Sequence, residues 1–215
     1  MRNSMIVLFI ISSLYYVFFI AYIDEPLKMV FKLIPMILVL LIALLSNASN
    51  TKFYKLIVLI GLIFCAIGDY TLQWFIIGLT SFLIGHLFYI RAFLSTNEQK
   101  TPSAAKILLI IFGLVMAFFI LSAIIQTGNY VLAIAVFCYI AVILTMGWTS
   151  FRTNSKFAII GAFLFIISDS VLAINKFVIP VEFSHQLIMS TYYGAQIFIA
   201  LSIVNYSAFK SKGVQ

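Results

Sequence analysis

The sequence predicts an all-α polytopic membrane protein, and three observations support this fold class. Of the 215 residues, 64% are hydrophobic and 9% are charged, and the mean hydropathy is +1.18. Globular domains carry about 25% charged residues, so a soluble fold of this size could not hide so much apolar surface. Apolar runs of about 18 to 22 residues recur along the chain, the length that crosses a hydrocarbon core of about 30 Å. Polar, glycine and proline residues separate these runs, as in turns between helices.

We expect eight transmembrane helices within a single domain over residues 1–215. The first apolar run resembles a signal sequence, but it is too long for the apolar part of one and no A-x-A cleavage site follows it. We therefore interpret it as an uncleaved first span. The expected limits of the spans are 5–23, 29–46, 53–72, 74–94, 104–126, 129–149, 155–174 and 184–208.

The distribution of basic residues predicts that both termini are cytoplasmic, because cytoplasmic loops carry an excess of Lys and Arg. The termini and even-numbered loops carry ten: Arg2, Lys52, Lys55, Arg91, Lys100, Lys106, Arg152, Lys156, Lys210 and Lys212. The odd-numbered loops and their margins carry Lys28, Lys32 and Lys176. The formal net charge of +7 does not indicate nucleic-acid binding, because these residues are scattered and form no patch.

Two aspartates lie in apolar segments in the same local context. Asp69 and Asp169 each follow a glycine by eight positions and precede a leucine by three, and five of thirteen positions match between 60–72 and 160–172. The match is consistent with a 4+4 parallel repeat, and coincidence among apolar residues is the alternative. Because burying a carboxylate in lipid is costly, we expect both to face the bundle interior, in the outer part of the membrane, as the functional site.

Other polar residues within the spans each allow two interpretations. Lys32 is a counter-ion or phosphate anchor, or it snorkels to the headgroups. His86 and Tyr89 share one helix face, and His86 either belongs to the site or is a hydrogen-bonded core residue. Tyr192 and Gln196 also share a face, and the alternative for them is an interhelical hydrogen bond.

These residues carry a resemblance to the YhhN family of membrane proteins, whose animal members are lysoplasmalogenases. The matching motifs are Lys32 with the following proline, Gly68-Asp69-x-x-Leu72, Phe82-x-x-Gly85-His86-x-x-Tyr89-x-x-x-Phe93, Gly161-Ala162-x-x-Phe165-x-x-Ser168-Asp169-x-x-Leu172-Ala173-x-Asn175-Lys176-Phe177 and Thr191-Tyr192-Tyr193-x-x-Gln196. Leu33 departs from the pattern, in which a proline directly follows the lysine.

The resemblance implies a hydrolase that cleaves the vinyl ether bond of lysoplasmalogens to a fatty aldehyde and a glycerophospho-alcohol. It implies that Asp69 and Asp169 are the catalytic pair. The substrate-binding residues that we expect are Lys32, His86, Tyr89, Asn175, Lys176, Tyr192, Tyr193 and Gln196. The expected partners are a lysophospholipid substrate and the lipid bilayer, and the expected location is a bacterial cytoplasmic membrane.

Vinyl ether hydrolysis is chemistry that two buried carboxyls can perform. Proton transfer to the β-carbon gives an oxocarbenium ion that water captures, so the reaction needs a general acid and a nearby negative charge. Two carboxyls in a low-dielectric site tend to share one proton, and at this stage either Asp69 or Asp169 can be the acid.

Three other functions are compatible with the same residues. A proton-coupled or small-molecule transporter also uses paired membrane aspartates. A hydrolase of another lipid bond could join His86 and His185 to the aspartates around a metal. A purely structural role is the third. We expect neither a metal nor a cofactor, because the sequence contains no H-E-x-x-H motif, no serine-hydrolase elbow, no P-loop and no dinucleotide fingerprint.

Overall fold

The computed structural model describes residues 2–22, 24–48, 51–96 and 99–212, apart from the side chains of residues 21, 25, 26, 205 and 207–212. Eight helices in this part of the chain are long and apolar enough to cross a membrane. They are α1 (Arg2–Phe19), α2 (Glu25–Leu45), α3 (Lys52–Thr71), α4 (Phe75–Thr96), α5 (Ser103–Gln126), α6 (Tyr130–Ser150), α7 (Lys156–Phe177) and α8 (Ser184–Lys212). The predicted all-helical membrane fold is therefore confirmed, and the helix limits differ from the expected ones by four residues or fewer.

Local sequence explains where several helices begin. Gly128 adopts a φ of 77°, which suits a residue without a Cβ, and the side chain of the next residue, Asn129, accepts a hydrogen bond from the backbone N–H of Leu132. This cap starts α6. Ser155 caps α7 in the same way, by accepting from the backbone N–H of Ala158. These caps satisfy backbone donors that have no partner within the helix.

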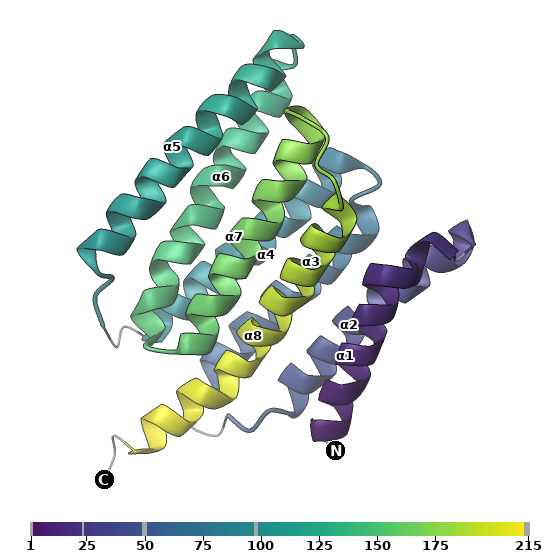
Figure 1. Ribbon diagram of the computed structural model, residues 1–215. Coiled ribbons are helices and arrows are strands. Elements are labelled where there is room, and N and C mark those ends of the chain that lie inside the picture. The colour runs from purple at the N-terminus through teal and green to yellow at the C-terminus, as the bar shows by residue number, and fades with distance from the viewer. Residues whose placement is uncertain (1, 23, 49–50, 97–98, 213–215) are drawn as a thin grey trace.

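The helices pack in three sets (Figure 1). Helices α5, α6, α7 and α8 follow one another side by side, while α3 and α4 lie behind them and α1 and α2 lie beside α8. The most extensive helix pairs are α3 with α4 and α7 with α8. A repeat of two four-helix halves would produce these equivalent pairs, and the repeat stays a prediction.

The first residue of α1 and the last residue of α8 lie at the same end of the bundle (Figure 1). Because successive helices alternate in direction, this end also carries the basic residues Arg2, Lys52, Lys55, Arg91, Lys100, Lys106, Arg152 and Lys156. The opposite end carries Lys28, Lys32 and Lys176. The side chains of Lys210 and Lys212 lie outside the described residues. The assignment of the basic end to the cytoplasm stays a prediction.

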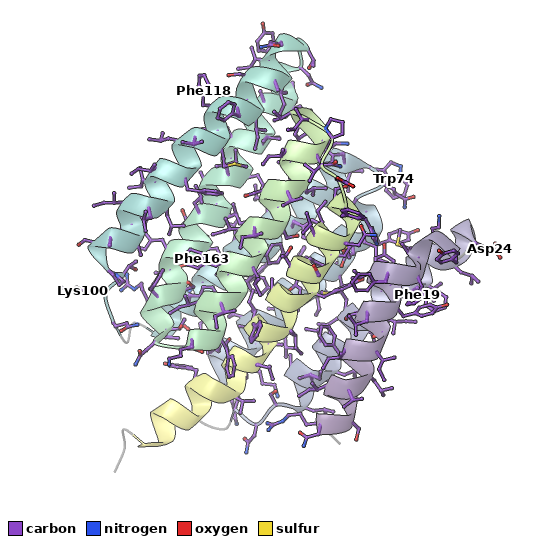
Figure 2. All side chains as sticks on the ribbon, in the orientation of Figure 1. Phe19, Asp24, Trp74, Lys100, Phe118 and Phe163 are labelled. Carbon is purple, nitrogen blue, oxygen red and sulfur yellow. The ribbon has the colours of Figure 1, made fainter. Side chains whose placement is uncertain are left out.

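Large apolar side chains cover the outside of the bundle, where lipid tails would contact them. Phe118 on α5 and Trp74 in the turn before α4 are 68% and 53% exposed and project from the surface (Figure 2). The interior is equally apolar, with Val58, Leu62 and Phe165 fully buried. Polar groups inside this bundle are therefore the exceptions that require an explanation.

Two glycines lie where neighbouring helices approach each other closely. A Cβ at Gly61 of α3 would lie 3.1 Å from the carbonyl oxygen of Gly85 on α4. A Cβ at Gly161 of α7 would lie 2.9 Å from the carbonyl oxygen of Ala195 on α8. Small residues at such positions let helix backbones approach each other in a membrane. Gly61 and Gly161 thus help to set the spacing of the α3–α4 and α7–α8 pairs.

We expect Gly161→Ala to destabilise the protein by about 1–3 kcal/mol, because an added methyl group in a packed interior forces the backbone apart. Thermal unfolding in detergent measures the effect. Gly194→Ala is the matched control, since its Cβ would meet only the flexible end of the Leu164 side chain, at 3.2 Å. Equal stability of the two variants would show that the α7–α8 spacing does not depend on Gly161.

Candidate active site

Asp69 lies near the C-terminal end of α3 and is 2% exposed. The residue before it, Gly68, faces α4, where a Cβ would lie 2.9 Å from the ring of Phe82. Without a side chain at this position, the Phe82 ring packs directly against α3. The close approach of α4 thus helps to enclose the Asp69 carboxyl within the bundle.

Both carboxyl oxygens of Asp69 have partners from other helices. The hydroxyl of Tyr192 on α8 donates to Oδ2 at 2.5 Å, and Nζ of Lys32 on α2 lies 3.5 Å from Oδ1. The same Nζ donates to the backbone oxygen of Asp69 at 2.9 Å. The Lys32 side chain is only 13% exposed. This geometry favours the counter-ion interpretation of Lys32 over snorkelling or a phosphate anchor.

The position of Lys32 depends on α2 and α8 together. Pro35 lies inside α2 three residues later, where it removes a backbone hydrogen bond and disturbs the preceding turn. The hydroxyl of Tyr193 on α8 donates to the backbone oxygen of Lys32 at 2.8 Å. The Tyr193 ring also contacts the rings of Phe9 and Tyr16 on α1. Tyr193 therefore holds α1 and α2 against α8, beside the ion pair.

Asp169 has a different environment on α7. The helix continues to Phe177, three residues beyond the expected limit at 174, so Asp169 lies eight residues, or about 12 Å, from its end. The hydroxyl of Tyr139 on α6 donates to Oδ2 of Asp169. No other hydrogen bond or ion pair involves the Asp169 carboxyl in the part of the chain that the structure describes.

A cluster of rings connects the surroundings of the two carboxyls. The ring of Tyr192, which binds Asp69, lies 5.5 Å from the ring of Phe165 on α7. The ring of His86 on α4 lies 4.4 Å from Phe165 and 5.4 Å from Tyr139, which binds Asp169. The described side chains include no direct hydrogen bond between the two carboxyls, but the carboxyls interact electrostatically through the apolar interior.

A partly enclosed cavity of about 60 Å³ lies beside Asp169, between α4, α5, α6 and α7. Most of its wall is aliphatic or aromatic, and its polar side chains are Asp169, Tyr139 and Ser170. The volume is enough for a few water molecules. Asp69 is not among the residues that line this cavity. The two carboxyls therefore differ in access as well as in partners.

Lys176 lies at the rim of this cavity. Its Nζ is 4.4 Å from the centroid of the Phe75 ring and 6.0 Å from that of Phe177, and both rings line the cavity. Lys176 follows Asp169 by seven residues, so the two lie on the same face of α7, about 10 Å apart along its axis. The side chain of Asn175 instead accepts a hydrogen bond from the backbone N–H of Val181 at 2.9 Å, which closes the α7–α8 loop.

The remaining expected site residues form buried contacts between helices. The hydroxyl of Tyr89 on α4 donates to Oε1 of Gln196 on α8 at 2.8 Å, and both side chains are fully buried. His86 Nδ1 pairs with the backbone oxygen of Phe82 at 2.6 Å, and its Nε2 has no partner among the described residues. His185 packs its ring against Tyr16, and its Nε2 has no hydrogen-bond partner among the described residues. Across the described chain, no three His, Cys, Asp or Glu residues group as metal ligands.

Tyr139 is the site residue that sequence reasoning missed. The sequence contains one weak indication of its role. Tyr139 bears a hydroxyl group in the middle of the apolar segment Ala135-Val136-Phe137-Cys138-Tyr139-Ile140-Ala141. Tyrosines at helix ends are explained by the membrane interface, whereas one at the centre of a span needs a polar partner. That partner is Asp169.

Comparison with known proteins gives three related findings. The profile described as the YhhN family matches residues 27–203. Lysoplasmalogenase TMEM86A of Bos taurus and of Homo sapiens are each 36% identical over 162 residues, covering 68% of this chain and 65% of the relative. Lysoplasmalogenase TMEM86B of Homo sapiens is 33% identical over 144 residues, covering 66% of this chain and 60% of the relative. The chain thus spans slightly less than two thirds of the length of these relatives, and no solved structure matches it.

Proposed function

The chain belongs to the YhhN family, and we propose that it is a membrane hydrolase of lysoplasmalogens. The reaction adds water across the vinyl ether bond and releases a fatty aldehyde and a glycerophospho-alcohol. Asp69 and Asp169 act as the acid/base pair. The protein works as an integral protein of a bacterial cytoplasmic membrane, where its substrate is a lysophospholipid within the bilayer.

The observation that carries this proposal is a pair of carboxyls in an apolar bundle, each held by a tyrosine hydroxyl from a neighbouring helix. Tyr192 binds Asp69, and Tyr139 binds Asp169. Such buried acids are costly, so their presence favours a functional role. A vinyl ether needs only a proton and water to break, and a carboxyl beside a small cavity can supply the proton.

The cavity and its rim suit the two ends of a single-chain phospholipid. The apolar wall, with residues such as Phe112, Met116 and Ile140, is chemically suited to contact with hydrocarbon. Lys176 at the rim can pair with the phosphate, as cations and phosphates do in charge-assisted hydrogen bonds. A phosphate at Lys176 directs the glycerol unit along α7 towards Asp169, which lies on the same helix face.

The test of this function is aldehyde release by the purified protein in detergent. We expect turnover of a 1-alkenyl lysophospholipid and none of its 1-alkyl analogue, which has the same shape but no double bond to protonate. A 1-acyl lysophospholipid is the second control. Cleavage of the acyl lipid in place of the alkenyl lipid would contradict the proposal and indicate a hydrolase of another bond.

A transporter is the alternative function, because paired membrane carboxyls also suit proton relays. A transporter forms no product in detergent, where there are no compartments to separate. Loss of substrate together with appearance of aldehyde therefore supports the hydrolase. Binding of the lipid without any product over long incubation favours the transporter.

We expect Lys176→Met to raise the KM for lysoplasmenyl lipid about tenfold or more, with a much smaller change in kcat. Hydrogen bonds to charged groups contribute about 1.5–3 kcal/mol, and the phosphate is remote from the bond that breaks. Steady-state kinetics in mixed micelles measure both constants. Lys100→Met is the control, because Lys100 is an exposed lysine at the other end of the bundle. An equal KM for both variants would remove Lys176 from the binding site.

A further inference from the structure

The two carboxyls differ in how many of their oxygens are occupied. Both carboxyl oxygens of Asp69 have partners, because Oδ2 accepts a hydrogen bond from Tyr192 and Oδ1 faces the ammonium group of Lys32. Only one carboxyl oxygen of Asp169 has a partner among the described residues, because Oδ2 accepts a hydrogen bond from Tyr139 and Oδ1 accepts none. Only Asp169 of the two lines the cavity beside α7. A substrate in that cavity can therefore reach a free oxygen of Asp169, whereas both oxygens of Asp69 are already engaged.

The charged groups around the two aspartates also differ, and those around Asp69 favour its ionised form. Around Asp69, α2 provides the ammonium group of Lys32. Helix α8 provides the phenols of Tyr192 and Tyr193, and α1 provides the phenol of Tyr16. The other titratable groups near this carboxyl, Cys65 of α3 and Tyr89 of α4, carry no positive charge. An ion pair compensates the burial of a carboxylate, so it favours the ionised form of Asp69.

Around Asp169, no cation lies within ion-pair distance in the described structure. Helix α6 provides Tyr139, α7 provides Ser170 and α4 provides His86, whose ring contacts Tyr139 rather than the carboxyl. An unpaired charge in an apolar cavity is costly, and the nearby carboxylate of Asp69 makes a second negative charge less favourable still. The neutral carboxylic acid is the form that suits this environment.

We propose that Asp169 is the general acid of the reaction and that Asp69 stays ionised as a fixed negative charge. This assignment rests on the proposed hydrolysis of lysoplasmalogens. With Tyr139 donating to Oδ2, the proton of the neutral acid resides on Oδ1, the oxygen without a protein partner. The acidic proton therefore faces the cavity, where the vinyl ether would lie.

The proposed steps balance without any further reactant. The Asp169 proton goes to the β-carbon of the vinyl ether, and the double-bond electrons form the new C–H bond, leaving an oxocarbenium ion. The carboxylate of Asp69 stabilises this cation. Water then attacks the cationic carbon and gives a proton back to Asp169, which forms a hemiacetal. The hemiacetal loses its hydroxyl proton as the C–O bond to glycerol breaks and the glycerol oxygen gains a proton, so that aldehyde and alcohol leave and the acid is restored.

Infrared spectroscopy of the substrate-free protein tests the assignment directly. The chain has three aspartates, Asp24, Asp69 and Asp169, so labelling aspartate carboxyls with ¹³C isolates their bands from those of glutamate. We expect a protonated-carboxyl C=O band at neutral pH in the wild type and in Asp69→Asn, and no such band in Asp169→Asn. Tyr139→Phe should keep the band but move it to higher frequency, because the carbonyl oxygen loses its donor.

The possible results separate the assignment from the proposed function. A band that disappears in Asp69→Asn and persists in Asp169→Asn would overturn the assignment, as would a wild type without a band. In either case aldehyde release by the wild type would still support lysoplasmalogen hydrolysis. If Asp169→Asn fails to fold, the Tyr139→Phe shift decides the question, because an unmoved band would mean that the protonated group is not Asp169. A correct band pattern without aldehyde release would overturn both the function and the acid role.

Discussion

Asp169→Asn is expected to lower the rate of aldehyde release at least about 1000-fold, the upper part of the range for loss of a general acid. The amide keeps the size of the side chain and an acceptor for Tyr139, but it has no acidic proton to transfer. The side chain at this position lines the cavity in which the lipid would bind. The measurement is single-turnover aldehyde release at saturating substrate, which separates chemistry from binding.

The control for this variant is Asp24→Asn, which removes an exposed carboxyl between α1 and α2. We expect its turnover and its unfolding temperature to match the wild type. The unfolding temperature of Asp169→Asn should also stay close to the wild type, since Asn can preserve the contact with Tyr139. An Asp169→Asn protein that folds and keeps more than a tenth of the wild-type rate would remove Asp169 from the reaction.

Lys32→Met is expected to lower the stability of the folded protein by about 3–5 kcal/mol. Removing one partner of a buried ion pair leaves the other charge uncompensated, and this is more costly than losing the pair altogether. Asp69 is 2% exposed, so water cannot replace the lost ammonium group. The double variant Lys32→Met/Asp69→Asn should therefore recover most of the lost stability while remaining impaired in aldehyde release.

Reversible unfolding in mixed detergent micelles gives the three free energies that this comparison needs. Lys176→Met is the control, because Lys176 is an exposed lysine at the same end of the bundle with no carboxylate within ion-pair distance among the described residues. A double variant no more stable than Lys32→Met alone would mean that Lys32 contributes through packing, and that Asp69 does not depend on it for its charge.

The membrane fold and the two candidate aspartates could be predicted from the sequence, because both depend on strong local signals. Apolar runs of spanning length and the polar breaks between them determine the helices, and an acidic residue inside such a run is rare enough to stand out. The pairing of Lys32 with Asp69 was one of the alternatives, and the structure favours it. For Asn175, the sequence motif suggested a contact with substrate, but its side chain accepts a backbone hydrogen bond that closes the α7–α8 loop.

The sequence could not reveal which side chains meet across helices. In a soluble bundle the polar face of each helix identifies its orientation, but here lipid outside and protein inside are equally apolar. Phe118 is exposed and Phe165 is fully buried although their types are identical. The partnership of Tyr139 with Asp169, and the cavity between α4, α5, α6 and α7, depend on these helix rotations. The extension of α7 to Phe177, which puts Asp169 two turns inside the helix, depended on helix-end signals too weak to predict.

In the proposed reaction an intramembrane carboxyl transfers a proton to the β-carbon of a lipid vinyl ether. Hydrolysis of a lysoplasmenyl lipid in D₂O by the purified protein tests it most directly, with the aldehyde reduced at once to an alcohol so that later exchange is prevented. We expect one deuterium atom on the carbon next to the former aldehyde carbon, and almost no product from Asp169→Asn. An aldehyde without deuterium at that carbon, or the same labelled product at the same rate from the variant, would contradict it.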